Sequence, residues 1–256
     1  MLLKHYFLGK IAHSSYVLAG TGNCAVIDPQ RDVDLYITQA RELGVTITHI
    51  LQTHLHADFV SGHMDLAQKT GATIYAPKSA NYSFEHVPLV EGDAIEIEDM
   101  LLHVLETPGH TPEHLCYTVT DRSRGDTPIG VFVGDVLFVG DVGRPDLFPE
   151  MATDLAGRLY DSLHEKLLKL PDHCEVYPAH GAGSLCGRSM GAKYRTTIGY
   201  ERCYNTALQL DKEDFVSSLT SRMPPAPDHF GRCSDINRHG PTLLADLPEL
   251  EGLRPA

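Results

Sequence analysis

The chain has 256 residues, enough for one large domain with a substantial core, and 42% of them are hydrophobic and 21% charged, as in ordinary globular proteins. A net charge of −13 argues against a nucleic-acid partner, and no Lys/Arg run indicates a membrane surface. Because no apolar run is long enough for a membrane span or a secretory signal, we expect a cytoplasmic protein whose six cysteines are free thiols.

The predicted elements of the first half of the chain alternate between strands and helices. We expect short strands, rich in apolar or β-branched residues, over 2–9, 14–19, 23–28, 45–54 and 70–77. Two helices lie between them, over 32–44 and 60–70. In the first helix, apolar residues recur at helical spacing, Asp32 can cap the start and Gly44 can end it.

The second half begins with a run of strands, which we expect over 94–97, 100–107, 113–120, 129–135 and 136–140. An amphipathic helix follows over 151–169, then a last strand over 173–180 and mainly helices after residue 190. This order favours an αββα sandwich of the α+β class, in which two mixed sheets pack face to face with helices outside.

We place a catalytic domain at residues 1–207 and a C-terminal helical appendage with a tail at 208–256. In the appendage, Asp211 can cap a helix over 213–222, which the PPAP segment at 224–227 is expected to stop.

Four of the predicted strands end in side chains that can bind metals. The segments are THLHAD at 53–58, TPGHT at 107–111, GD at 134–135 and PAHG at 178–181. They present His54, His56, Asp58, His110, Asp135 and His180. Because rigid scaffolds present functional groups in loops at strand ends, we expect these four loops to converge at one edge of the sandwich.

Taken together and in this order, the four segments resemble the metallo-β-lactamase superfamily, over about residues 5–205. In its two-metal members, one metal takes the histidines of the first two segments. The other takes Asp58, the histidine after it and His180, and Asp135 bridges both metals. Here the residue after Asp58 is Phe59, whose ring has no lone pair and fills the position with apolar bulk. The two-metal form is therefore disfavoured.

The persulfide dioxygenase branch of this superfamily uses one iron, and its ligands match His54, His110 and Asp135. Two histidines and one carboxylate form the facial set typical of non-haem Fe(II), which leaves open positions for a substrate and O2. The resemblance implies one Fe(II) per chain, and zinc can take its place because raw affinity does not select iron.

The neighbouring groups have more than one interpretation. In the persulfide dioxygenase branch His56 orients the site by hydrogen bonds, and the alternative is a third nitrogen ligand to zinc. Asp58 holds a ligand or a water, and His180 is an orienting group, a proton donor or a capping histidine. We expect His63 at an exposed helix position rather than as a replacement ligand, and His114 to be structural.

Further segments narrow the resemblance to bacterial members that often carry fused rhodanese domains. These segments are HADFVSGH, LFVGDVGRPDLF, YPAHGAGSLCG and TTIGYER. A rhodanese or another sulfurtransferase is therefore an expected partner. Stand-alone persulfide dioxygenases tend to have HADH and a shorter segment after PAH, so the longer segment at 181–195 is expected to affect the choice of substrate.

Candidate substrate residues follow the metal-binding segments. Arg144 and Asp146 are expected to pair and brace their loop, and the alternative for Arg144 is a substrate contact. Cys186 is either a small buried residue or a thiol that meets a sulfur substrate. A basic cluster comprises Arg188, Lys193, Tyr194 and Arg195. It is either solvated surface or a site for the carboxylates of an anionic thiol such as glutathione.

These observations favour a dioxygenase that converts a low-molecular-weight persulfide, such as glutathione persulfide, and O2 into sulfite and the thiol. Two alternatives stay open. One is a zinc-dependent thioester hydrolase of the glyoxalase II type, and the other is a persulfide sensor or carrier with Cys186 as the acceptor. A homo-oligomer is compatible with the sequence.

Overall fold

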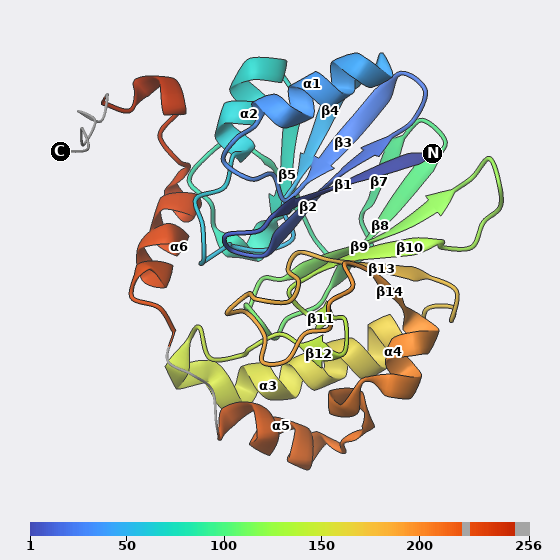
Figure 1. Cartoon of the computed structure of the whole chain (residues 1–256), viewed down its shortest axis with the longest axis vertical. Helices are drawn as coiled ribbons and strands as arrows, with labels where there is room; N and C mark the ends of the chain where they lie inside the picture. The colour runs from blue at the N-terminus through green and yellow to red at the C-terminus, as the bar shows by residue number, and fades with distance from the viewer. Residues whose placement is uncertain (222–225, 249–256) are drawn as a thin grey trace.

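The computed structural model describes residues 1–221 and 226–248, which form two six-stranded sheets packed face to face (Figure 1). The first sheet has the strand order β1-β2-β3-β4-β5-β6. Its strands are β1 Leu2–Leu8, β2 His13–Ala19, β3 Asn23–Ile27, β4 Thr46–Leu51, β5 Thr73–Pro77 and β6 Val87–Leu89. β1 to β3 are antiparallel and β3 to β6 are parallel, so the sheet is mixed, as predicted.

The second sheet has the strand order β14-β13-β10-β9-β8-β7. Its strands are β7 Ala94–Ile97, β8 Met100–Glu106, β9 Leu115–Asp121, β10 Gly130–Gly134, β13 Glu175–Pro178 and β14 Thr196–Thr197. The strand expected over 136–140 is present only at Leu137–Phe138 and does not belong to this sheet. The chain turns directly after β10, where Val136 N donates to Val133 O, and then forms only a small hairpin of β11 Leu137–Phe138 and β12 Asp141–Val142.

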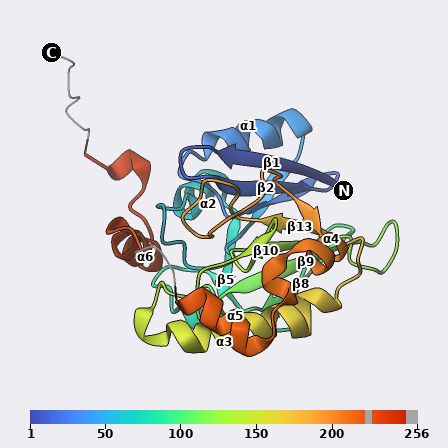
Figure 2. The ribbon, with the colours of Figure 1, turned by 60° about the horizontal axis from the view of Figure 1, so that its bottom comes forward.

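Helices cover the outer face of each sheet (Figures 1 and 2). The first sheet carries α1 Asp34–Leu43 and α2 His63–Thr70, and the second carries α3 Ala152–Asp161, α4 Ile198–Tyr204 and α5 Lys212–Thr220. α6 His229–His239 lies along one side of the sandwich. Short 3₁₀ helices lie at Lys78–Ala80, Pro149–Met151, Leu167–Lys169, Thr206–Gln209 and Leu244–Asp246. This arrangement confirms the predicted αββα fold.

Three apolar cores hold the layers together. Leu102 and Phe132 belong to the core between the two sheets, and Leu66 to the core under α1 and α2. Leu159 of α3 and Phe215 of α5 share the third core, and neither side chain is exposed. α5 therefore packs on the sandwich itself, and the domain boundary at residue 207 stays a prediction.

The helix ends follow local hydrogen bonding. Asp211 caps α5 by accepting from Asp214 N at 2.9 Å, and Gly44 ends α1 with a φ of 69°, both as expected. The N-cap position of α1 is Val33, which has no side-chain bond, but Asp32 does accept from the first helical N–H, that of Asp34, at 3.3 Å. The helix expected over 151–169 is α-helical only to residue 161 and continues as a π turn at Ser162–Lys166.

α2 begins at His63, three residues later than predicted. The bond back to its N-cap runs from Leu66 N to Gly62 O at 2.9 Å, and the N–H groups of Ser61 and Gly62 donate to Asn237 Oδ1 at 2.9 Å and to Pro29 O at 3.0 Å. The first half of the PPAP segment and the whole tail from residue 249 lie outside the described residues. Within the described ranges, no helix combines the length and the apolar character needed to cross a bilayer.

Strand pairing brings the predicted metal-binding loops to one edge of the sandwich. β10 and β13 are parallel neighbours, so Asp135 and His180 follow adjacent strand ends. Gly134 has a φ of 48°, and a Cβ atom there would lie 2.4 Å from Nε2 of His114, so glycine is required before Asp135. A backbone bridge between His13 and His180 joins the first sheet to the second at this edge.

Candidate metal centre

Three buried side chains from three loops meet at one point. The Nε2 atoms of His110 and His54 lie 3.4 Å and 3.8 Å from Oδ2 of Asp135. All three side chains are at most 1% exposed, and one potential ligand atom from each lies within 4.8 Å of the other two. The structure thus brings together the three residues that the sequence predicts as iron ligands.

Hydrogen bonds decide which nitrogen of each histidine faces this point. Thr53 Oγ1 donates its single proton to Asp28 Oδ2 at 2.8 Å, so Nδ1 of His54, also 2.8 Å from Oγ1, must be a donor. Nδ1 of His110 donates to the carbonyl oxygen of Arg144 at 2.8 Å. Burial lowers the pKa of both imidazoles, so each is neutral and keeps a lone pair on Nε2.

Two nitrogen lone pairs and a carboxylate oxygen therefore face one another with no proton between them. Oδ2 of Asp135 is buried and has no hydrogen-bond partner among the described residues. Buried polar atoms are nearly always paired, and neutral imidazole with carboxylate is a donor set suited to first-row divalent metals. The three side chains therefore fit a divalent cation bound by His54, His110 and Asp135.

His180 lies between two carboxylates. Its Nδ1 is 2.7 Å from Oδ1 of Asp135 and its Nε2 is 2.8 Å from Oδ2 of Asp58. Burial by itself lowers the pKa of His180, but the two carboxylates outweigh this effect and hold the pKa well above its usual range. Burial likewise acts to raise the pKa of Asp135, but the charge of His180 holds it well below its usual range. As an imidazolium, His180 donates from both nitrogens and orients the carboxylate of Asp135 toward the metal position.

His56 lies outside the group of ligand atoms. Its Nε2 is 3.2 Å from Oδ1 of Asp28, at ion-pair distance but without hydrogen-bond alignment. The other carboxylate oxygen of Asp28 accepts from Thr53, which orients His54. His56 therefore contacts the group that supports a ligand, which agrees with its expected orienting role.

Phe59 occupies the position next to Asp58 and is 8% exposed. Its ring centroid lies 4.2 Å from that of His13 and 4.8 Å from that of His56. A second set of potential ligand atoms, from Asp58, His180 and Cys186, does lie within 4.8 Å. Within this second group His180 and Asp58 contact each other at 2.8 Å, and Phe59 adds no ligand because its ring has no lone pair.

Arg144 and Asp146 pair as predicted, through Nε and Nη2 at 2.7 Å and 2.8 Å. The Arg144 side chain is fully buried and also donates to the carbonyl oxygen of Leu185. Because the carbonyl of Arg144 accepts from His110, this pair braces a ligand. Cys186 is 2% exposed, and burial raises the pKa of its thiol to about 12, so it is a neutral thiol near pH 7.

The structure does not gather the basic cluster into one site. Arg188 donates to the carbonyl oxygen of Ser218 at the end of α5, whereas Tyr194 and Arg195 line a separate small cavity beside β1. Tyr194 lies near the metal loops, because a Cβ atom on Gly181 would be 3.8 Å from its ring. The cluster therefore does not form a shared carboxylate site.

For two further histidines, the prediction is wrong for His63 and agrees with the structure for His114. The prediction that His63 is exposed is wrong: the side chain is 1% exposed and its ring packs 4.7 Å from Phe84, because α2 turns this position inward. His63 is also absent from the group of ligand atoms. His114 is structural, as predicted, since its Nε2 accepts from Asp135 N at 3.1 Å and its Nδ1 lies 2.9 Å from Thr107 Oγ1.

Three residues around the site were not singled out from the sequence. Asp28 supports the first metal-binding loop, His13 packs on Phe59, and Asn237 holds the loop from α6. The sequence could have indicated Asp28, because this residue ends a predicted strand as the other site residues do. Asn237 lies about 180 positions after the loop, and nothing local to it in the sequence indicates the contact.

A cavity of about 340 Å³ opens beside the metal position. Ala57 and Thr111, which neighbour the metal-binding histidines in sequence, line one side of it. Phe148, from the loop after Asp135, and Phe230 and Arg238 of α6 line the other side. The lining is largely apolar, and Asp235 and Arg238 are its charged members.

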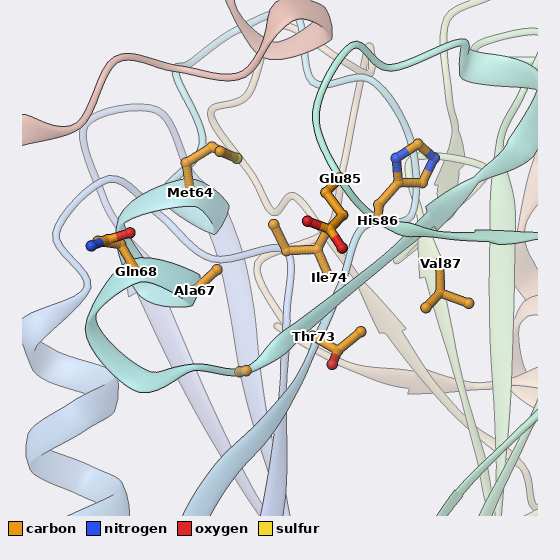
Figure 3. A pocket seen from close by; sticks show the side chains of 9 residues that line it. Met64, Ala67, Gln68, Thr73, Ile74, Glu85, His86 and Val87 are labelled. Atoms are coloured by element: carbon orange, nitrogen blue, oxygen red, sulfur yellow. The ribbon is translucent and has the colours of Figure 1, made fainter.

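A hollow of similar size, about 390 Å³, lies elsewhere, between α2 and the strands β5 and β6 (Figure 3). Its lining includes Met64, Ile74, Glu85 and His86, none of which belongs to a metal-binding segment.

Comparison with known proteins places the chain in a family. Residues 8–180 match the family model described as the metallo-beta-lactamase superfamily. The chain is 29% identical over 239 residues to the mitochondrial persulfide dioxygenase ETHE1 of Bos taurus, covering 90% of this chain and 85% of that protein. It is 37% identical over 234 residues to a hydroxyacylglutathione hydrolase of Rhodopseudomonas palustris, covering 90% and 81%.

The fold also matches a solved structure. A crystal structure of a metallo-beta-lactamase from Staphylococcus aureus superposes with a TM-score of 0.89 at 37% identity, covering 94% of this chain and 73% of that one. With the two mixed sheets and the histidine and aspartate cluster at their edge, these similarities show that the chain belongs to the metallo-beta-lactamase superfamily.

Proposed function

We propose that the protein is a persulfide dioxygenase that uses one Fe(II) held by His54, His110 and Asp135. The observation that carries this proposal is the buried three-ligand group of His54, His110 and Asp135, beside a second group to which Phe59 can add no ligand. Two neutral histidines and one carboxylate are the facial set of non-haem Fe(II) oxygenases. Similarity to ETHE1 over 90% of the chain supports the same reaction class.

The proposed reaction is RSSH + O2 + H2O → RSH + sulfite + 2 H⁺, in which the terminal sulfur is oxidised, O2 is reduced and the S–S bond breaks. Bound Fe(II) supplies open positions and one-electron chemistry toward O2. The side chains of Phe148 and Phe230 exclude water from the cavity beside the metal position, and the ligands fix the geometry. His180 holds a proton between Asp58 and Asp135, close to where the thiol leaves.

A second candidate is a thioester hydrolase of the glyoxalase II type, because the relative from Rhodopseudomonas palustris is a hydroxyacylglutathione hydrolase. Its chemistry relies on a metal-activated hydroxide. Phe59 argues against the two-metal form of this enzyme, and His180 is already engaged by Asp58. A sensor or carrier role is less well supported, because the acceptor Cys186 is buried and its raised pKa keeps the thiol protonated.

One experiment separates these functions. The protein is reconstituted under anaerobic conditions with Fe(II) or Zn(II), and its metal content is measured. O2 uptake and sulfite are followed with glutathione persulfide, and thioester cleavage with S-lactoylglutathione. We expect stoichiometric iron and O2 uptake that depends on persulfide, with His110→Ala as the inactive control. Thioester cleavage by the zinc form without O2 uptake would instead establish the hydrolase.

The identities of the substrate and of the protein partner are also proposals. Glutathione persulfide is the proposed substrate, and a rhodanese or sulfurtransferase is the proposed partner. Their affinities can be measured with the reconstituted protein once the reaction is established.

A further inference from the structure

The first metal-binding loop is held from the far end of the described chain. Nδ2 of Asn237, on α6, donates to the carbonyl oxygens of His56 and Phe59, each at 2.8 Å. Oδ1 of Asn237 accepts from Ser61 N at 2.9 Å. Asn237 is 2% exposed, so all three bonds are shielded from water.

These bonds provide partners for backbone groups in a stretch of chain that has no regular secondary structure. Residues 52–62 lie between β4 and α2 and belong to neither, although most of them are buried. Buried backbone groups outside helices and strands need side-chain or water partners. Asn237 supplies three such partners within one loop, so the path of the chain from His54 to Ser61 depends on its amide group.

The chain is also fastened directly after Asn237 and again seven residues later, at Leu244. Arg238 donates to the carbonyl oxygen of Ala80 at 2.6 Å and its own carbonyl accepts from Ser83 N at 2.9 Å. Further along, Leu244 N donates to Asp65 Oδ1 at 2.8 Å. α6 is therefore fixed to the first sheet independently of the metal loop, as a support for the loop must be.

We propose that Asn237 is a positioning residue for the metal centre: it fixes the loop that carries His54 and places Phe59 in the second position. Orienting groups that do not bind the metal typically contribute 10–100-fold to metal affinity or activity. The proposal rests on the metal centre and not on which reaction occurs there. Its readouts are therefore the metal affinity and spectrum, which do not change with the identity of the substrate.

The test uses the full-length protein loaded with Co(II), whose absorption spectrum reports ligand geometry. We expect Asn237→Ala to weaken Co(II) binding about tenfold or more and to change the spectrum. Asn237→Asp has the same shape and keeps the acceptor for Ser61 N, but loses the donors to His56 and Phe59. We expect Asn237→Asp to change the Co(II) spectrum as well. It replaces Asn237→Ala in this test if the alanine variant does not fold.

Asn205→Ala is the matched control, because Asn205 is also a buried asparagine whose Nδ2 donates to a backbone carbonyl, that of Asp141 at 3.0 Å, away from residues 54–61. We expect it to lower the melting temperature while leaving Co(II) affinity and spectrum as in the wild type. The proposal is overturned if both Asn237 variants keep the wild-type affinity and spectrum. It is also overturned if Asn205→Ala produces the same spectral change, because Asn237 would then act only through general stability.

Discussion

The ring of Phe59 packs on the imidazole of His13, with 4.2 Å between the two centroids. The ring of His13 lies in turn 5.2 Å from that of His180. We propose that Phe59, packed in this way, keeps a further ligand out of the second metal position. The relationship gives a direct test of why the second position is closed.

Phe59→His should open the second position. The introduced imidazole would join Asp58 and His180, with Cys186 nearby, and we expect metal content to rise from one to two equivalents per chain in zinc-reconstituted protein. Phe59→Leu is the control, because it keeps apolar bulk and adds no ligand. Two equivalents in the wild type would show that Phe59 does not close this position.

Cys186→Ser distinguishes catalysis at the metal from sulfur transfer to a protein thiol. Because the thiol is buried and burial raises its pKa to about 12, we expect the variant to retain its iron and its persulfide-dependent O2 uptake. Mass spectrometry of the wild type after persulfide treatment should show no added sulfur on Cys186. Loss of turnover together with such an adduct in the wild type would favour the carrier alternative.

Asp146→Ala should destabilise the protein, because it removes the carboxylate partner of the buried Arg144 guanidinium. Removing one partner of a buried ion pair costs about 3 kcal/mol in the free energy of unfolding. Asp154→Ala, which breaks the exposed pair with Arg158, should change it by no more than about 0.5 kcal/mol. Urea unfolding of the three proteins measures both values, and equal losses would contradict the bracing role.

Glu98 should make stability depend on pH in acid. Its carboxylate accepts from the backbone N–H groups of Thr21, Gly22 and Asn23, which joins a turn of the first sheet to a turn of the second. The hydrogen bonds from Thr21, Gly22 and Asn23 lower the pKa of Glu98 to about 2 from its ordinary 4.5. The folded pKa lies below the unfolded one, so the stabilisation is complete above about pH 4.5 and is lost as the pH falls toward 2.

The corresponding measurement is the melting temperature across this pH range. The difference between the wild type and Glu98→Gln should be largest near neutral pH and shrink below pH 4.5. A difference that stays constant down to the lowest pH at which the protein folds would rule out this carboxylate as the titrating group.

The sequence by itself determined the elements and the chemistry of the centre. Periodicity, turn residues and the Asp211 cap predicted most strands and helices, because these signals act between residues close in the chain. Ligand types placed at strand ends predicted where His54, His110 and Asp135 meet. The meaning of Phe59 could also be inferred, because a side chain without a lone pair cannot bind a metal in any fold.

Only the tertiary structure decided what surrounds these residues. The tautomer of His54 depends on Thr53 and Asp28, the charge of His180 on Asp58 and Asp135, and the shape of the loop on Asn237 from α6. The burial of His63 and the dispersal of the basic cluster were likewise invisible. Each of these outcomes rests on contacts made by packing, often between residues more than a hundred positions apart, and such contacts leave no local pattern in the chain.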